Sequence, residues 1–226
     1  MRLQDSVTMA TVHIGGQTML LLPEKAVFLP ESDTLVVADA HFGKAVTFHE
    51  VGSAGLGMAD ESLEILGMLV RRFNARRMVF LGDFLHAMRS RSPTVMAALT
   101  QWRREHARLE LQLVRGNEDE RSGDPPAELG IDAVEEPLML GSLALCHQPQ
   151  PVAGAYVLAG HLHPCVSVGG RAHDWLRMPC YWFTREFGVL PAFGAFTGMQ
   201  TIWVRSGERV FAATPERVFE LAPKRC

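Results

Sequence analysis

The sequence has no excess of positive charge, no long apolar run and few cysteines. Its 22 Lys and Arg residues are outnumbered by 25 Asp and Glu, which gives a formal net charge of -3, so no overall basic field attracts nucleic acid. Contacts with phosphates would therefore depend on local patches or on metal ions. No apolar run approaches the length of a membrane span, and no early segment resembles a secretion signal. We expect a cytoplasmic protein with no membrane contact.

The four cysteines lack the paired CxxC spacing that is typical of structural zinc sites. In a cytoplasmic chain of 226 residues they are expected to be reduced and mostly buried. Cys165 closely follows the sequence HLHP, so a zinc site of mixed His and Cys is an alternative, but a buried residue on a strand is the favoured interpretation.

Hydrophobic periodicity alternates between strands and helices in the first half of the chain. Helical spacing appears in residues 60–74, with Asp60 as the expected N-cap, and in residues 92–106, with Ser92 as cap and Pro93 at the first position. Gly15 and Gly16 are the expected turn of an early hairpin. Further strands are expected within residues 11–22, 26–41, 76–83, 109–117, 138–147, 155–163, 189–198 and 201–213.

This order of elements favours an α/β sandwich that is parallel in its first half. The composition, 47% hydrophobic and 21% charged, is ordinary for a globular protein with a sizeable core. No stretch resembles a linker between independent domains, so we expect residues 1–226 to form a single domain.

Polar side chains that can bind metals follow one predicted strand after another. In such sheets, functional residues gather beyond the carboxyl ends of the strands. Asp, Asn and His suit pairs of manganese, iron or zinc ions, and five strand ends with such groups are a rarer coincidence than a lone surface histidine. By the same standard, His13, His49, His106 and His173 are interpreted as ordinary residues. The groups at strand ends are Asp39, His41, Asp83, His86, Asn117, Asp119, His147, His161 and His163.

The stretches DAH, GDFLH, GNED, CH and GHLH resemble, in this order, the five motifs of the calcineurin-like metallophosphoesterases, over about residues 35–165. Two more stretches, DAHFGKAVTF and LPAFGAFTG, resemble the ligase-associated DNA-damage-response metallophosphoesterases, a bacterial branch often described as endonucleases. The resemblance implies a metallophosphoesterase-type sandwich of two mixed β-sheets flanked by helices.

The resemblance also implies two divalent metal ions, with manganese favoured and iron or zinc as alternatives. Such ions lower the pKa of a bridging water and stabilise the charge that develops on phosphoryl oxygens. Asp83 would bridge the two ions. One ion would be held by Asp39, His41, Asp83 and His163, and the other by Asp83, Asn117, His147 and His161.

Two catalytic candidates lie beside these ligands. His86 resembles a histidine that contacts the phosphate or protonates the leaving oxygen in related repair nucleases. Glu118 occupies the place where the family has a histidine; beside two dications it would stay ionised and donate no proton. We therefore expect Glu118 to bind metal or water, or to face solvent. The candidates for binding flanking phosphates are Lys44, Arg89, Arg91 and Arg115, although each alone is more often a solvated charge.

Three functions follow from this reading. The favoured one is a two-metal phosphodiesterase or nuclease in DNA repair, with a phosphodiester, DNA included, as substrate and a repair helicase or ligase as partner. The second is a phosphomonoesterase or small-nucleotide hydrolase that uses the same site. The third is a metal-bound, catalytically weak module of a repair complex, which the substitution at Glu118 makes more plausible.

Overall fold

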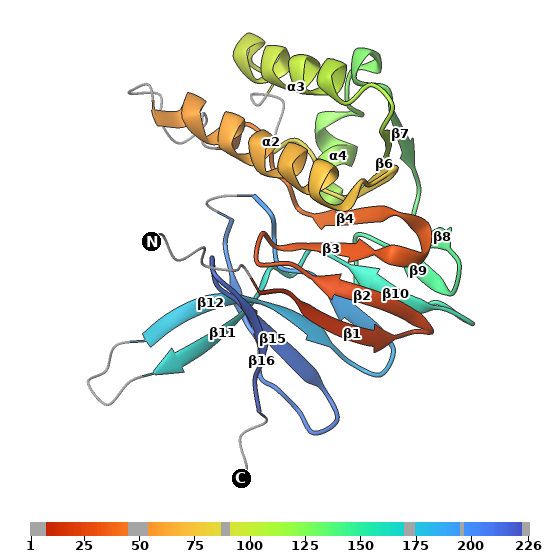
Figure 1. The fold of residues 1–226 in the computed structure, drawn as a ribbon, viewed down its shortest axis with the longest axis vertical. Helices are drawn as coiled ribbons and strands as arrows, with labels where there is room; N and C mark the ends of the chain where they lie inside the picture. Colours follow the sequence, from red (N-terminus) through yellow and green to blue (C-terminus); the bar gives the residue numbers. More distant parts are fainter. Residues whose placement is uncertain (1–7, 45–53, 87–90, 170–174, 195–196, 223–226) are drawn as a thin grey trace, which may run out of the picture.

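The computed structural model describes residues 8–44, 54–86, 91–169, 175–194 and 197–222, and its strands form two sheets (Figure 1). The first sheet has the order β1-β2-β3-β4-β5-β6-β7. Its strands are β1 (Ala10–Ile14), β2 (Gln17–Leu21), β3 (Ala26–Leu29), β4 (Thr34–Ala38), β5 (Arg77–Leu81), β6 (Glu110–Val114) and β7 (Ile131–Val134).

The second sheet has the order β14-β11-β12-β13-β10-β9-β8, and β15 and β16 extend it from β12. Its strands are β8 (Leu138–Leu140), β9 (Leu143–Leu145), β10 (Tyr156–Ala159), β11 (Pro164–Gly169), β12 (Trp175–Phe183), β13 (Phe187–Val189), β14 (Gln200–Thr201), β15 (Arg209–Ala213) and β16 (Val218–Glu220).

Both sheets are mixed, as the family resemblance implied. The predicted early hairpin is present, with Gly15 and Gly16 between β1 and β2, and β1 to β4 pair antiparallel. Strands β4 to β7 pair parallel, so the expectation of a parallel first half holds for four of the seven strands. This parallel part matters most for function, because it aligns the carboxyl ends of neighbouring strands.

Alternating side chains of the central strands supply two cores. On β4, Leu35 and Val37 face a core shared with the helices, whereas Val36 and Ala38 face the core between the two sheets. Fully burying one Val or Leu side chain contributes roughly 1.5–3 kcal/mol. Both faces of β4 are therefore buried, and Asp39 follows directly at the carboxyl end of the strand.

The helices are α2 (Ala54–Phe73), α3 (Pro93–Glu105) and the short α4 (Asn117–Ser122). As predicted, α3 has Pro93 at its start and Ser92 as its cap, whose side chain accepts a hydrogen bond from the backbone N–H of Val95 at 3.4 Å. The prediction of Asp60 as the cap of α2 was wrong, since that helix begins at Ala54. Gly55 and Gly57 lower the helical propensity of its first turns, so the sequence pattern did not predict them. A glycine weakens a helix without preventing it.

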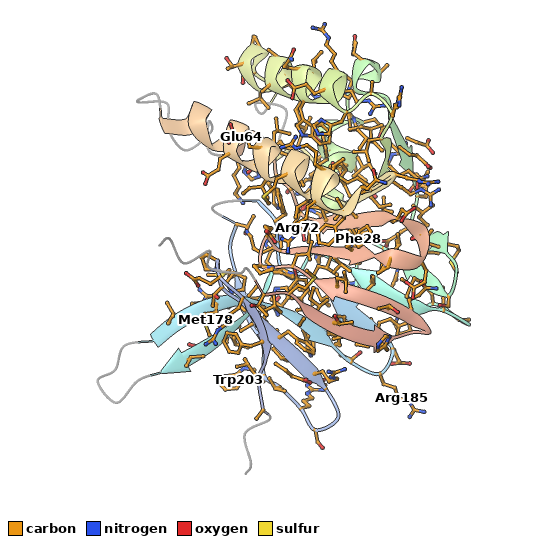
Figure 2. All side chains as sticks on the ribbon, in the orientation of Figure 1. Phe28, Glu64, Arg72, Met178, Arg185 and Trp203 are labelled. Atoms are coloured by element: carbon orange, nitrogen blue, oxygen red, sulfur yellow. The ribbon has the colours of Figure 1, made fainter. Side chains whose placement is uncertain are left out.

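Helices α2 and α3 lie together along one side of the first sheet (Figure 1). Phe28 of β3 stacks on Phe73 at the end of α2, with ring centroids 4.6 Å apart; Phe28 and the neighbouring Arg72 are labelled in Figure 2. Within the described ranges, no helix is long and apolar enough to cross a membrane. Cys146, Cys165 and Cys180 are buried free thiols, as expected, and Cys226 lies outside the described residues.

Candidate metal centre

The candidate ligands of the first sheet follow three adjacent parallel strands. In the pairing register, Ala38 lies opposite Leu81, and Leu81 lies opposite Val114, so β4, β5 and β6 end at the same edge. Asp39 and Asp83 follow the first two strands closely, and Asn117 begins α4 just beyond the third. The backbone N–H of His41 donates to the carbonyl of Asp83 at 2.9 Å, which holds the first two loops side by side.

The second sheet brings three histidines to the same place. His147 follows β9, and His161 and His163 lie between β10 and β11. A Cβ atom at Gly82 would lie 2.0 Å from Nδ1 of His147, and Gly82 has a φ of 74°, so only glycine fits this close approach. The two sheets therefore meet at the candidate site.

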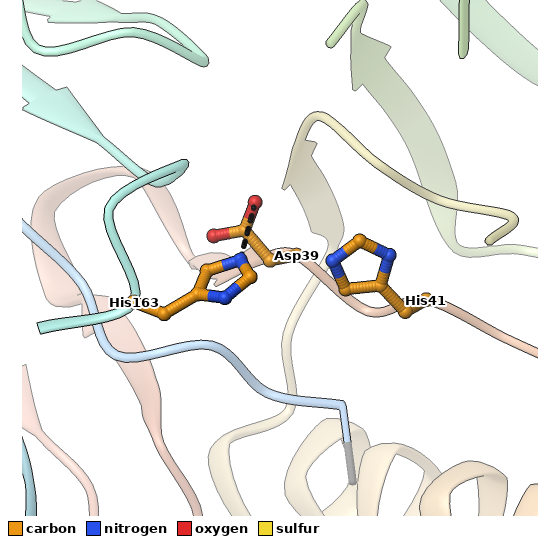
Figure 3. Close-up of side chains that lie close together, drawn as sticks. All are labelled: Asp39, His41 and His163. Carbon is orange, nitrogen blue, oxygen red and sulfur yellow. Dashed lines mark ion pairs between the residues drawn. The ribbon is translucent and has the colours of Figure 1, made fainter. Parts of the chain in front are cut away.

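Two groups of side chains have the spacing of metal ligands. Figure 3 shows the first group, in which the carboxylate of Asp39 pairs with the ring of His163 and the ring of His41 lies beside them. The second group is Asp39, Asp83 and His147, and within each group the ligand atoms lie within 4.8 Å of one another. Asp39 belongs to both groups, whereas the family resemblance gave the bridging position to Asp83.

Asp83 also reaches both halves of the site. Its Oδ2 lies 3.7 Å from Nε2 of His41, and its Oδ1 lies 3.7 Å from Nε2 of His147. The same nitrogen of His147 lies 3.0 Å from Oδ1 of Asn117 and 3.0 Å from Nδ1 of His161. All seven ligand candidates from the sequence thus lie in one continuous cluster, and the carboxylate of Asp83 faces imidazole nitrogens in both halves of it.

Unpartnered imidazole nitrogens indicate that the cluster fits metal ions. Both ring nitrogens of His41 are buried and have no hydrogen-bond partner among the described residues, and Nε2 of His163 faces only the carboxylate of Asp39, at 3.5 Å. Buried polar atoms are normally hydrogen-bonded, so such atoms require an explanation. Imidazoles and carboxylates that face one another are a suitable donor set for divalent ions.

The backbone of the cluster is strained at five of its seven members. Asp39, His41, Asp83, His161 and His163 have φ values of 52°, 45°, 50°, 69° and 46°. Residues other than glycine are uncommon in this left-handed region, and each costs about 1–3 kcal/mol. Such strain clusters at functional sites, where the surrounding structure holds it in place.

Burial shifts the pKa values of His41 and Asp83 in the cluster. Desolvation lowers the pKa of His41 to about 2, and neighbouring cationic groups such as Lys44 add to this effect. Desolvation also raises the pKa of Asp83. His41 is therefore neutral at pH 7, which is the form that binds a metal ion.

Two carboxylates outside the predicted ligand set position the loops of the cluster. Asp119 is buried, and its side chain accepts hydrogen bonds from the backbone N–H groups of Asp83 at 2.7 Å, Phe84 at 3.0 Å and Gly116 at 2.9 Å. Glu136 accepts from the backbone N–H of His147 at 2.7 Å. Asp119 was grouped with the strand-end residues, whereas the role of Glu136 has no signal in the sequence.

The two catalytic candidates lie at the edge of the cluster. The ring of His86 stands edge-on to that of His41, with centroids 5.5 Å apart, and its Nδ1 is buried without a partner among the described residues. Glu118 is partly buried, and its carboxylate lies 3.6 Å from the guanidinium of Arg121. The side chain of Glu118 is thus engaged along α4.

The cationic candidates for phosphate binding differ in their surroundings. Arg115 forms ion pairs with Asp124 at 2.7 Å and Glu135 at 2.8 Å, so a phosphate would have to compete with two carboxylates. Arg91 donates to the backbone carbonyls of residues 122–124, which ties it to the end of α4. Lys44 is partly buried beside the cluster; desolvation lowers its pKa, and Glu118, Asp83 and Asp39 oppose that shift. Arg89 lies outside the described residues.

Comparisons with known proteins agree with this geometry. No protein-family model matches the chain, and no curated protein matches it. Among solved structures, a nuclease MPE from Pseudomonas putida is 38% identical, with a TM-score of 0.84 over 95% of this chain and 100% of that chain. The phosphoesterase Yfce from E. coli is 12% identical, with a TM-score of 0.41 over 84% of this chain and 98% of that chain, a likeness too low to support any argument.

The likeness to the Pseudomonas nuclease extends over nearly the whole chain, at an identity that indicates common descent as well as a common fold. It coincides with the motif resemblance and with the cluster of Asp and His side chains at the strand ends. The chain therefore belongs to the calcineurin-like metallophosphoesterases, metal-dependent hydrolases of phosphate esters, in the branch to which the motifs and the Pseudomonas nuclease both point.

Proposed function

We propose that this protein is a phosphodiesterase that acts as a nuclease. The observation that carries the proposal is the convergence of seven Asp, Asn and His side chains from both sheets. Divalent ions bound there would supply hydroxide near neutral pH and neutralise charge on the phosphoryl oxygens. One ion would be held by Asp39, His41, Asp83 and His163, and the other by Asp83, Asn117, His147 and His161.

Residues at the rim of the cluster would handle the substrate. His86 has an unpartnered ring nitrogen beside His41, which suits contact with a phosphoryl oxygen or with the leaving oxygen. Lys44 lies near the acidic ligands, and its amine would attract a phosphate held by the metal ions.

The arrangement of arginines favours a diester over a terminal phosphate as substrate. A phosphomonoester carries more negative charge and needs additional cations around it. Arg91 and Arg115 are the two predicted phosphate-binding arginines that lie in the described residues, and both are engaged by protein oxygens. A phosphomonoesterase or small-nucleotide hydrolase is therefore the weaker alternative.

We propose manganese as the resident metal. The cluster consists of imidazole, carboxylate and amide groups without a thiolate, and such groups suit manganese, iron and zinc pairs. Elemental analysis of protein purified without added metal would identify the ion. Zinc or iron at two equivalents per chain, with little manganese, would contradict this assignment.

We further propose a role in DNA repair in the cytoplasm, with a helicase or ligase that delivers the DNA. With a net charge of -3, and with Arg91 and Arg115 engaged by protein oxygens, the protein alone can neutralise few phosphates. Binding to DNA should therefore be weak and change little with salt concentration. Tight binding to duplex DNA with a steep dependence on salt would contradict the need for a delivering partner.

The decisive experiment compares four substrates with and without added manganese: a bis-aryl phosphodiester, an aryl phosphomonoester, and labelled single- and double-stranded DNA. Asp83→Asn, which should lose the metal centre, is the matched control for contaminating nucleases. Diester and DNA cleavage that requires Asp83 supports a nuclease. Faster hydrolysis of the monoester would favour a phosphomonoesterase, and metal binding without turnover would favour a binding module of a repair complex.

A further inference from the structure

A lysine on the turn between β2 and β3 contacts a segment near the metal centre. Nζ of Lys25 donates a hydrogen bond to the backbone carbonyl of Phe193 at 2.7 Å, and it also lies 6.0 Å from the centroid of the Phe193 ring. The amine is partly buried, and no carboxylate of the described residues forms an ion pair with it. Burial lowers the pKa of Lys25 to about 8. Removing an amine from water without a counter-ion costs free energy, so the position of Lys25 requires an explanation.

The segment held by Lys25 lies directly along the first ligand loop. The backbone N–H of Phe193 donates to the carbonyl of Ala38 at 2.8 Å, and that of Gly194 donates to the carbonyl of Asp39 at 3.1 Å. A Cβ atom at Gly194 would lie 2.5 Å from the carbonyl oxygen of Ala40, so the two backbones touch without room for a side chain. Residues 193–194 therefore contact the loop that carries Asp39 and His41.

That loop needs external support. Asp39 and His41 both have left-handed backbones, with φ values of 52° and 45°, and such conformations persist only where neighbours hold them. Hydrogen bonds to the carbonyls of Ala38 and Asp39 are part of that support. The carbonyl oxygen of Phe193 accepts its hydrogen bond from Nζ of Lys25.

We propose that Lys25 is a positioning residue of the metal centre. Through the Phe193 carbonyl, its amine holds residues 193–194 against the Asp39–His41 loop, and this contact raises the affinity for the metal ion. The inference rests on the proposed function in that Asp39 and His41 are taken as metal ligands. It assigns a role to a residue 168 positions away from its partner Phe193 and outside every motif of the family resemblance.

The test uses metal-stripped protein and measures the dissociation constant of Mn²⁺ by titration calorimetry. Lys25→Met keeps a long apolar side chain but removes the donor. Groups that orient metal ligands from outside typically change metal affinity about 10- to 100-fold, and we expect a loss of this size. At saturating Mn²⁺ the variant should recover most of its rate on an aryl phosphodiester, which general unfolding would not allow.

Glu24→Gln is the matched control. Glu24 lies beside Lys25 on the same turn, and its carboxylate lies 3.5 Å from Arg72 of α2, so this variant disturbs the turn without removing the contact to Phe193. Its Mn²⁺ affinity should equal that of the wild type. Gly194→Ala tests the same contact from the other side, because the new methyl group would push against Ala40. It should weaken Mn²⁺ binding even though Lys25 is intact.

The outcomes separate this inference from the proposed function. If the wild type binds Mn²⁺ and Lys25→Met binds it equally well, the role of Lys25 is refuted and the metal centre stands. Absence of Mn²⁺ binding in the wild type would overturn both. Should Lys25→Met fail to fold, as judged by circular dichroism in the metal-free state, unchanged affinity in Gly194→Ala would still refute the proposal.

Discussion

The backbone N–H of Glu118 donates a hydrogen bond to Oδ1 of Asp83 at 3.0 Å. This contact orients the predicted bridging carboxylate, and it uses only main-chain atoms of residue 118. The side chain at this position is therefore free to change without loss of the hydrogen bond. Position 118 can be tested for catalysis separately from metal binding.

Glu118→His should accelerate cleavage of substrates with poor leaving groups. An ionised carboxylate donates no proton, whereas a histidine can protonate the departing deoxyribose oxygen. We expect DNA cleavage to rise about ten- to a thousand-fold, the range for restoring one acid catalyst, with little change on aryl diesters, whose phenols depart unaided. Paired rates with metal content measured in each variant check this. Glu118→Gln controls for loss of the charge. A loss of DNA cleavage with both metals retained would mean that Glu118 has a positive role.

His86→Ala should remove most of the remaining activity on DNA. His86 is the described imidazole beside the cluster that is not among the predicted ligands, and its Nδ1 has no protein partner in the described residues. We expect a loss of about a hundredfold on DNA and a smaller loss on an aryl diester. In the Glu118→His background, the same substitution should cost less, because a second acid is present. Equal losses on both substrates would assign His86 to binding of the phosphate.

Asp83→Asn should reduce the content of both metals, whereas His41→Ala should reduce one preferentially. Asp83 lies 3.7 Å from imidazole nitrogens in both halves of the cluster, and His41 belongs to one half. Elemental analysis of the purified variants, with folding verified by circular dichroism, provides the measurement. Near-normal stoichiometry in Asp83→Asn would eliminate Asp83 as the bridge and favour Asp39, which belongs to both groups of ligands.

Lys25 should make the stability of the metal-free protein depend on pH. Its pKa is about 8 in the folded protein and 10.5 in the unfolded chain, so between these values the unfolded chain binds more protons. The free energy of unfolding should therefore rise with pH over this window. Urea unfolding at pH 7.5 and pH 10 should show the wild type gaining stability relative to Lys25→Met. Groups common to both proteins cancel in this difference, and a constant difference would contradict the shifted pKa.

The sequence predicted the parallel strands β4, β5 and β6, the fold class and the cluster of candidate ligands because one feature encodes all three, whereas the strand expected within residues 189–198 ends at Val189. An apolar run followed at once by Asp or His predicts a buried strand and also places the polar side chain at the end of that strand, as for Ala38 and Asp39. Parallel pairing of β4, β5 and β6 then brings the ends together.

Supporting contacts between distant segments were not predictable in this way. Glu136 holds the backbone of His147, and Lys25 holds Phe193, but neither residue type nor spacing distinguishes them from surface charges. The same holds for Arg115, whose ion pairs depend on where the loops with Asp124 and Glu135 pass. The start of α2 was misplaced because Gly55 and Gly57 weaken the local helical propensity of its first turns.

The division of the ligands between two sheets also sets an order of events during biogenesis. The first sheet presents Asp39, His41, Asp83 and Asn117, and the histidines His147, His161 and His163 arrive only with the second. A nascent or half-folded chain therefore offers an incomplete set of donors and competes poorly for scarce metal. If the seven side chains are the metal ligands, we expect the ions to bind only after the two sheets have docked, so that hydrolysis of phosphate esters begins in the folded protein.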